Sequence, residues 1–154
     1  MRLVIVGGGA AGSQAALEAR KFDKNAEITL IERQNVPQYS LCGLPYALSG
    51  DIQNFDNLII FPKEFYEKQK INLLLQKEIK KINVFDKKVI LEDNSEIDYD
   101  SLILATGAIP CNYKLGYKYP EGLYFIRTLD DAKKLSKKID TSKKAIIYAY
   151  GWGC

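Results

Sequence analysis

The chain has 154 residues, enough for one domain with a core of its own, and its formal net charge of +3 does not by itself indicate a nucleic-acid-binding protein. It contains no histidine, which excludes a Ser–His–Asp triad and most zinc sites, so we expect no metal site. No apolar run approaches the ~20 residues of a membrane span. The three cysteines, Cys42, Cys111 and Cys154, are too far apart for a metal-binding or disulfide pattern, which favours a reducing, cytoplasmic setting.

The first 32 residues predict a β-α-β unit. Residues 3–6 form a continuous apolar run, typical of a strand buried on both faces, and residues 27–32 (EITLIE) predict a second strand. Between them, residues 13–22 predict a helix, and we expect its buried face to be formed by Ala11, Ala15, Ala19 and Phe22. Such a unit implies a parallel strand pair with a right-handed crossover.

Two short helices are expected next. Pro45 suits the first turn of one helix, which Gly50 would end, and Pro62 suits the start of the other, with Phe65 on its buried side.

Further strands follow these helices. We expect a buried strand over 71–75, an antiparallel meander over 78–99 and another buried strand over 101–107.

The remaining residues predict a linker over 108–121, a helix capped by Thr128, and a strand beginning near residue 144. The helix would bury an apolar face formed by Leu129, Ala132, Leu135 and Ile139. We interpret the lysines at 133, 134, 137, 138, 143 and 144 as a solvated surface rather than a nucleic-acid site. These features suggest three parts: residues 1–110, 111–143 and 144–154.

The strongest functional pattern is Gly7-x-Gly9-x-x-Gly12 between a strand and a helix. In a dinucleotide-binding fold, the first glycine permits a tight turn, the second lets the backbone approach a pyrophosphate, and the third allows close packing of helix on strand. Glu32 ends the next predicted strand, where a carboxylate can accept hydrogen bonds from ribose hydroxyls and repel a 2′-phosphate. The alternative is a glycine-rich turn in an α/β core with a chance acidic residue.

Cys42 is the second functional candidate, because it lies just before a predicted helix. A helix N-terminus stabilises a thiolate, which would make Cys42 a redox nucleophile. The alternative is an ordinary buried thiol.

Four segments carry a resemblance: 4–33 (VIVGGGAAGSQAALEARKFDKNAEITLIER), 42–46 (CGLPY), 101–110 (SLILATGAIP) and 122–135 (GLYFIRTLDDAKKL). Together they resemble the N-terminal part of the FAD-dependent pyridine nucleotide–disulfide oxidoreductases, in the single-cysteine branch that includes CoA-disulfide reductases and NADH oxidases. The resemblance covers roughly Arg2 to Ile147. It implies an α/β fold: a Rossmann-like, three-layer FAD/NAD(P)-binding domain with a β-meander crossover.

The resemblance also implies roles for particular residues. Those holding the FAD pyrophosphate would be Gly7, Gly9, Ala10, Ala11 and Gly12. The adenosine ribose would be bound by Glu32 and Arg33, and the adenine would contact Ile79. The segment that closes over the FAD would be formed by Ala105, Thr106 and Gly107. Next to the flavin would lie Cys42, and the CoA-contacting positions would be Gln14, Lys21 and Leu41.

The activity implied for the parent protein passes a hydride from NAD(P)H to FAD and then electrons to Cys42 and an acceptor, a CoA disulfide or another small disulfide. Alternatives are an NADH oxidase that reduces dioxygen and a nucleotide-binding module without turnover. Ala10 stands where peroxidases of the branch carry a histidine, which argues against a peroxidase. The family's second dinucleotide fingerprint is not matched over 144–154. We therefore expect a fragment of a homodimeric enzyme that shows negligible turnover alone.

Overall fold

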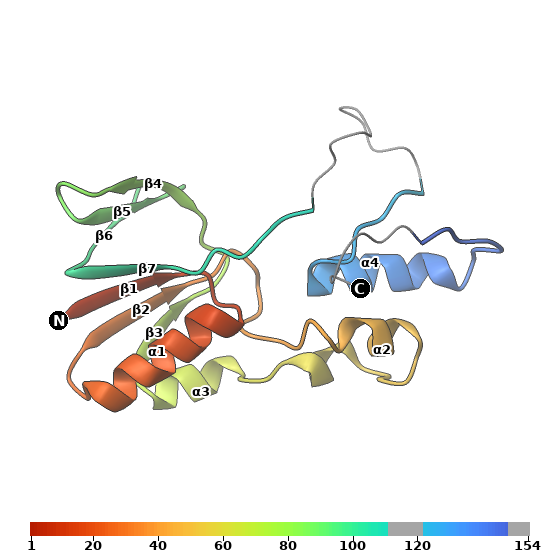
Figure 1. The fold of residues 1–154 in the computed structure, drawn as a ribbon, viewed down its shortest axis with the longest axis horizontal. Helices are drawn as coiled ribbons and strands as arrows, with labels where there is room; N and C mark the ends of the chain where they lie inside the picture. The colour runs from red at the N-terminus through yellow and green to blue at the C-terminus, as the bar shows by residue number, and fades with distance from the viewer. Residues whose placement is uncertain (111–121, 148–154) are drawn as a thin grey trace.

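The computed structural model describes residues 1–110 and 122–147. Figure 1 shows three layers: helices α1 and α3, a four-stranded sheet, and a meander of three short strands on the opposite side. A second group of elements, α2 and α4, lies beyond one end of the sheet. The predicted three-layer α/β fold with a β-meander crossover is confirmed.

The central sheet is parallel throughout and has the strand order β3-β2-β1-β7. Its strands are β1 (Arg2–Val6), β2 (Glu27–Ile31), β3 (Ile71–Leu74) and β7 (Ser101–Leu104). Helix α1 (Ala10–Phe22) connects β1 to β2, so the predicted β-α-β unit is correct.

One face of the sheet packs against α1, but the expected buried face of this helix was partly wrong. Phe22 is 96% exposed and Ala11 is also exposed, whereas Ala15 and Ala19 are only partly buried. The buried residues of α1 are Gly12, Ser13, Ala16 and Leu17. The predicted and the observed buried residues both recur at helical spacing, so periodicity alone does not distinguish the two faces of the helix. The close approach of the helix at Gly12 turns the face with the observed buried residues toward the sheet.

Helix α3 (Lys63–Lys68) covers the same face beside α1 and likewise corrects a prediction. Pro62 directly precedes the helix, as expected. Phe65 is only half-buried, while Tyr66 is fully buried in the core with Ile5 and Leu30. A tyrosine can be buried here because its hydroxyl finds a hydrogen-bond partner within the core.

The other face of the sheet is covered by the predicted meander. Its strands, β4 (Ile79–Asn83), β5 (Lys88–Leu91) and β6 (Glu96–Asp98), pair antiparallel in chain order. They bury a second core cluster, Val4, Val6, Ile31, Val89, Leu91 and Tyr99.

Two strand predictions need correction. Strand β7 exists, but it is the edge of the sheet, and Ile103 and Leu104 are 37% and 60% exposed. Burial of a strand residue requires an element packed on that face of the sheet; the other edge strand, β3, has such cover and buries Ile71 and Leu73. Residues 144–147 are not a strand, and Ile146 and Ile147 are 98% and 90% exposed. A strand requires a paired partner, and these residues have none among the described ones.

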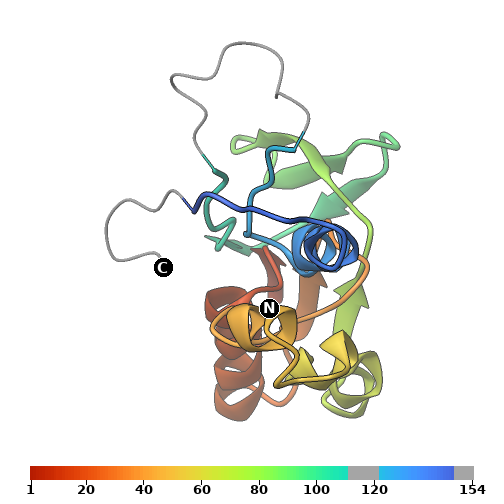
Figure 2. The same ribbon diagram turned by 90° about the vertical axis from the view of Figure 1, so that its right-hand side faces the viewer.

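The second group consists of α2 (Leu44–Leu48), a 3-10 turn (Phe55–Leu58) and α4 (Leu129–Ile139). Pro45 lies in the first turn of α2, and the Thr128 side chain caps α4, as expected. Figures 1 and 2 both show α4 over α2, and the shared core is formed by Leu44, Ala47, Leu58, Leu129 and Ala132. The expected apolar face of α4 is buried at its start but not at its end, since Ile139 is 43% exposed.

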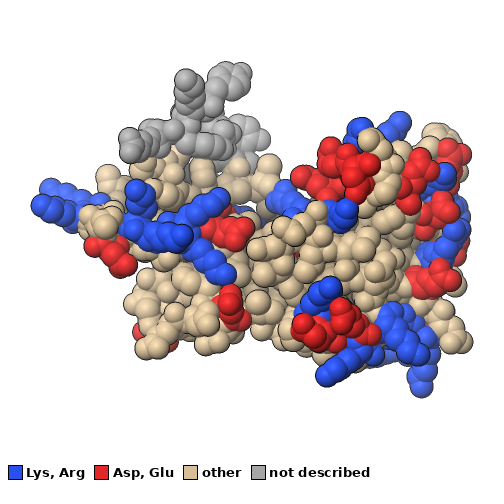
Figure 3. Space-filling view, turned by 180° about the vertical axis from the view of Figure 1, so that it is seen from behind, with Lys and Arg blue, Asp and Glu red and all other residues tan. Residues whose placement is uncertain are grey.

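The part boundaries proposed from the sequence stay a prediction, and the expected linker lies mostly outside the described residues. Within residues 1–110 and 122–147, no helix is long and apolar enough to cross a bilayer. Lysines gather on α4 and the residues after it, at the left of Figure 3, where they are mostly exposed.

Candidate nucleotide-binding site

The candidate site lies at the carboxyl edge of the parallel sheet. Four predicted segments follow strand ends there: 7–12 after β1, 32–33 after β2, 76–79 after β3 and 105–107 after β7. After β1 the chain continues to β2 on one side, while β7 pairs with β1 on its other side, so the strand order reverses at β1. Open α/β sheets bind their ligands at such a point. The fold therefore gathers residues that are distant in the sequence.

The segment from Gly7 to Gly12, which we call the glycine turn, is packed too closely for side chains at two positions. Gly7 has a φ of +104°, and a Cβ there would overlap the carbonyl group of Ala105. A Cβ on Gly12 would overlap the carbonyl oxygen of Gly7. The Ala105 amide donates to the Val6 carbonyl at 2.7 Å, which brings the 105–107 segment against the turn. Close packing thus requires a glycine at both positions, as the pattern predicted.

Gly9 differs from these two glycines because it faces open space. A Cβ at Gly9 would meet no atom within 4 Å. Gly9 is the N-cap of α1, no side chain caps this helix end, and its first turn carries no acidic residue. The first N–H groups of a helix and its positive dipole end favour an anion. The open space beside Gly9 therefore suits a phosphate group.

Glu32 is 7% exposed and holds the glycine turn in place. One carboxylate oxygen, Oε2, accepts a hydrogen bond from the Gly8 amide at 2.6 Å, and the other, Oε1, accepts one from the Gln34 amide at 2.8 Å. Each oxygen retains a second lone pair. Glu32 thus orders the turn in the ligand-free chain and can still accept a hydrogen bond from a ribose hydroxyl.

A cleft of about 470 Å³ opens beside Arg33. The β3–β4 connection is tied to the end of β2, since the Gln76 and Lys77 amides donate to the Gln34 and Glu32 carbonyls at 3.0 and 3.1 Å. Ile79, the predicted adenine contact, directly follows this connection. The residues lining the cleft are Arg33, Gln34, Asn35, Gln76, Glu78, Thr128, Asp130, Asp131 and Lys134.

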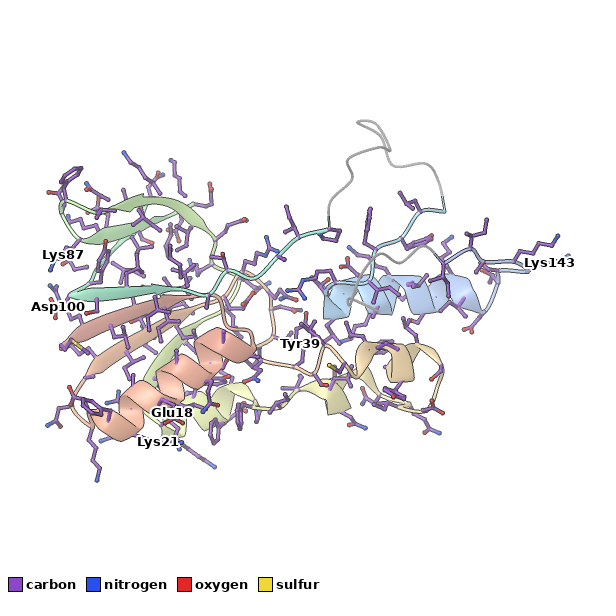
Figure 4. All side chains as sticks on the ribbon, in the orientation of Figure 1. Glu18, Lys21, Tyr39, Lys87, Asp100 and Lys143 are labelled. Carbon is purple, nitrogen blue, oxygen red and sulfur yellow. The ribbon has the colours of Figure 1, made fainter. Side chains whose placement is uncertain are left out.

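Two residues near the start of α4, which the sequence did not single out, contribute to this edge. The Arg127 Nε donates to the Ala108 carbonyl at 3.0 Å, next to Gly107. The Tyr39 hydroxyl accepts the Leu129 amide at 3.1 Å and donates to Gln34 Oε1 at 3.0 Å, and Figure 4 shows Tyr39 between the sheet and α4. Burial raises the pKa of Tyr39. These contacts of Arg127 and Tyr39 become visible only in the folded structure, because Arg127 lies far from the glycine turn in the sequence.

Cys42 lies outside the carboxyl edge of the sheet. Its thiol is exposed, so the alternative of an ordinary buried thiol is wrong. Gly43 separates it from α2, which spans only five residues. The Gly43 amide donates to Ser40 Oγ at 3.1 Å, and Leu41 is 42% exposed. The thiol is therefore accessible to a small molecule.

The predicted CoA-contacting residues of α1 share one exposed face. Gln14 Nε2 and Lys21 Nζ both contact Glu18 Oε1, at 2.7 and 2.6 Å. Figure 4 shows Glu18 and Lys21 on this helix. Lys21 lowers the pKa of the Glu18 carboxyl. Leu41 comes from a different segment, and the position of all three at a substrate stays a prediction.

A parallel sheet, a glycine turn after its first strand, open space at the following helix start and a buried carboxylate after its second strand define a dinucleotide-binding protein of the Rossmann-like class. The family model for pyridine nucleotide-disulphide oxidoreductases matches residues 1–148, so the chain belongs to this family. The resemblance found in the sequence is thereby confirmed. The family uses FAD and NAD(P)H.

Individual relatives differ in the acceptor that their names indicate. The chain is 32% identical to an NADH oxidase of Methanocaldococcus jannaschii, over 98% of its own length and 35% of that protein. It is 31% identical to a coenzyme A disulfide reductase of Staphylococcus haemolyticus, over 98% and 36%. A solved NAD-dependent persulfide reductase from A. fulgidus matches with a TM-score of 0.83 and 29% identity, over 92% and 28%. The chain thus spans about a third of the length of these curated relatives.

Proposed function

We propose that this chain is the FAD-binding N-terminal portion of an NAD(P)H-dependent flavoprotein reductase. The observation that carries the proposal is the open space at Gly9, beside the uncapped start of α1 and next to two glycines that are tightly packed. The uncapped helix start distinguishes Gly9 from other exposed glycines, because its free N–H groups can bind an anion. In the family, FAD supplies the hydride and electron chemistry, while the protein binds and orients it.

Different residues of the chain would bind different parts of the cofactor. The amides of Gly9, Ala10 and Ala11 would bind the pyrophosphate, as the first amides of a helix can. Glu32 and Arg33 would hold the adenosine ribose, and the backbone at Ile79 would contact the adenine, beside the cleft that Arg33 lines. Ala105, Thr106 and Gly107 would cover the cofactor from β7, with Arg127 fixing that segment through Ala108.

Substituting Gly9 tests this proposal, because a side chain there disturbs nothing in the ligand-free chain. We expect Gly9→Val to fold as the wild type does but to bind FAD and ADP at least tenfold more weakly, because its side chain fills the phosphate space. Flavin fluorescence titration measures the FAD affinity, and urea denaturation checks the fold. Ala145→Val adds similar bulk at an exposed position outside the turn and should bind normally. Equal FAD affinity of wild type and Gly9→Val would refute the proposal.

Cys42 would be the redox residue of the parent enzyme, cycling between a thiolate and a mixed disulfide or sulfenic acid. Its exposure supports this role, and a reducing cytoplasm is the location we propose. The leading acceptor is a CoA disulfide or another small disulfide, with Gln14, Lys21 and Leu41 as its contacts. We expect Cys42 to react with CoA disulfide in the folded chain and Cys42→Ser to lose that mixed disulfide by mass spectrometry. A mixed disulfide formed only at another cysteine would argue against a redox role of Cys42 and for the nucleotide-binding module without turnover.

Turnover of the whole enzyme is a separate question, because the chain spans about a third of its curated relatives. We propose that this chain alone binds nucleotide without catalysing NAD(P)H oxidation, since proximity of nicotinamide and flavin is worth roughly 7–11 kcal/mol of barrier. Homodimerisation of the parent enzyme is part of the same proposal. FAD-dependent NADH consumption by the homogeneous chain at an enzymatic rate would overturn it.

A further inference from the structure

A pair of hydroxyl groups is fully buried beneath the glycine turn. Tyr66 of α3 and Ser13 of α1 are both 0% exposed. The Tyr66 hydroxyl donates to Ser13 Oγ at 2.8 Å, and Ser13 Oγ donates to the carbonyl oxygen of Gly8 at 2.8 Å. A serine has one hydrogen to donate, so with Gly8 as its acceptor the hydrogen bond from Tyr66 runs in the direction just given. The pair forms a relay from α3 to the turn.

The position of the Tyr66 ring is fixed by its neighbours. Phe61 and Phe65 pack edge-on against it, with centroid distances of 6.3 and 5.9 Å. Burial raises the pKa of Tyr66, while hydrogen bonds to Ser13 and to the backbone at Gln38 act in the opposite direction. A buried hydroxyl costs free energy unless it is hydrogen-bonded, and a phenylalanine would fill the same volume without that cost. The Tyr66 hydroxyl avoids this cost through its two hydrogen bonds, and the one to Ser13 connects it to the turn.

The relay acts on the orientation of one peptide plane. The described peptides are all trans, so the Gly8 carbonyl and the Gly9 N–H point in opposite directions. With the carbonyl held inward by Ser13, the Gly9 N–H is directed away from the helix interior. Gly9 is also the position where a Cβ would meet open space. The relay thus aims a backbone donor at the space proposed for phosphate.

The preceding peptide is held in a comparable way. Its N–H, that of Gly8, donates to Glu32 at 2.6 Å. Its carbonyl, that of Gly7, lies against Gly12, where a Cβ would overlap it. Side chains from α1, α3 and the end of β2 therefore fix both peptides before any ligand arrives. A preorganised donor loses less conformational entropy on binding.

We propose that Tyr66 and Ser13 are positioning residues that aim the Gly9 amide at the diphosphate of the bound nucleotide. This inference rests on the proposed function of the glycine turn. Ser13 acts directly on the Gly8 carbonyl, and Tyr66 acts through Ser13. A hydrogen bond to a charged group contributes more than one between neutral groups, so a misdirected amide should weaken diphosphate binding measurably.

The test compares ADP, which carries the diphosphate, with adenosine, which lacks it, on the 154-residue chain. We expect Ser13→Ala to weaken ADP binding about tenfold and Tyr66→Phe about threefold, with adenosine binding unchanged. The double variant should resemble Ser13→Ala alone, because the two groups act in series. Tyr99→Phe removes a hydroxyl from a largely buried tyrosine in the other core cluster and should leave ADP binding unchanged.

The amide resonance of Gly9 provides a readout that general destabilisation would not move. In ¹⁵N–¹H spectra of the ligand-free folded variants, we expect this resonance to shift in Tyr66→Phe and Ser13→Ala but not in Tyr99→Phe. Tyr66→Phe preserves the core volume, so it carries the test if Ser13→Ala does not fold. ADP affinities equal to that of the wild type, or equal losses for ADP and adenosine, would overturn the inference. A wild-type chain that binds neither FAD nor ADP would instead refute the proposed function.

Discussion

The glycine turn and the segment around Cys42 were both predicted as functional, but they are held very differently. In the turn, Glu32 and Ser13 hydrogen-bond the backbone of Gly8 from two other elements, and Gly7 and Gly12 are packed against neighbouring carbonyl groups. Cys42 is exposed and precedes a helix of five residues. The turn is thus preorganised within this chain, whereas the environment of the thiol is open to solvent.

This difference indicates how the two sites would function. A diphosphate needs several fixed backbone donors, which a rigid strand–turn–helix unit provides. A thiol that exchanges with a disulfide needs access more than rigidity. The comparison predicts that substitutions of the packed glycines of the turn lower stability, while substitution of Cys42 itself changes stability little.

The largest effect is expected from Gly7→Ala. Its φ of +104° disfavours any side chain, and the new Cβ would overlap the Ala105 carbonyl, so we expect a loss of about 3 kcal/mol or more in the free energy of unfolding. Urea denaturation followed by circular dichroism measures it. Gly9→Ala is the matched control and should change stability by less than ~1 kcal/mol. Similar losses for both variants would mean that the turn is not packed as described.

Alkaline pH should weaken the fold through its buried tyrosines. Burial raises the pKa of Tyr66 and of Tyr39 above the ordinary value of 10.0, so folding favours their neutral forms. Their contribution to stability is complete below pH 10 and is lost as pH rises through the folded-state pKa values. Urea midpoints between pH 8 and 11 should fall less steeply for Tyr66→Phe than for Tyr46→Phe, which removes the hydroxyl of an exposed tyrosine. An identical slope in these two variants would contradict the prediction.

Tyr39→Phe tests the link between the Cys42 segment and α4. The variant loses the hydroxyl that accepts the Leu129 amide and contacts Gln34, so we expect a loss of about 1 kcal/mol in stability and faster hydrogen exchange of the first amides of α4. Tyr46→Phe, at a tyrosine that is 59% exposed, is the control and should change neither. If α4 exchanges at the wild-type rate in Tyr39→Phe, another contact holds it in place.

The smallest effect is expected from Glu18→Gln on the exposed face of α1. Removing the carboxylate frees Lys21 from its ion pair without a measurable change in stability, because surface pairs contribute little. Binding of CoA, measured by calorimetry, should tighten by no more than about twofold, and added salt should abolish the difference. Glu64→Gln removes the same charge from α3 and should have no effect. A weaker affinity for CoA in Glu18→Gln would remove Lys21 from the proposed contacts.

The sequence by itself determined the elements whose signals are local. Glycine spacing predicted the turn after β1, short strands separated by turn residues predicted the meander, and Thr128 predicted the start of α4. Such features depend on backbone conformations and hydrogen bonds within a few residues. The predicted parallel pair also placed Gly7 and Glu32 at one edge of the sheet, whereas a position of the 105–107 segment near them was implied by the family resemblance.

Only the tertiary structure decided which side chains are buried and which distant groups meet. The periodicity of α1 allowed two neighbouring faces, and the contact of Gly12 with the turn selected the one containing Ser13. Tyr66 reaches Ser13 from a helix 53 positions later, which no local pattern indicates. Leu104 carries the apolar pattern of a buried strand yet is 60% exposed, because the elements packed on the sheet leave its side chain uncovered. Burial depends on the neighbours that the fold brings to a residue, and the local sequence does not contain them.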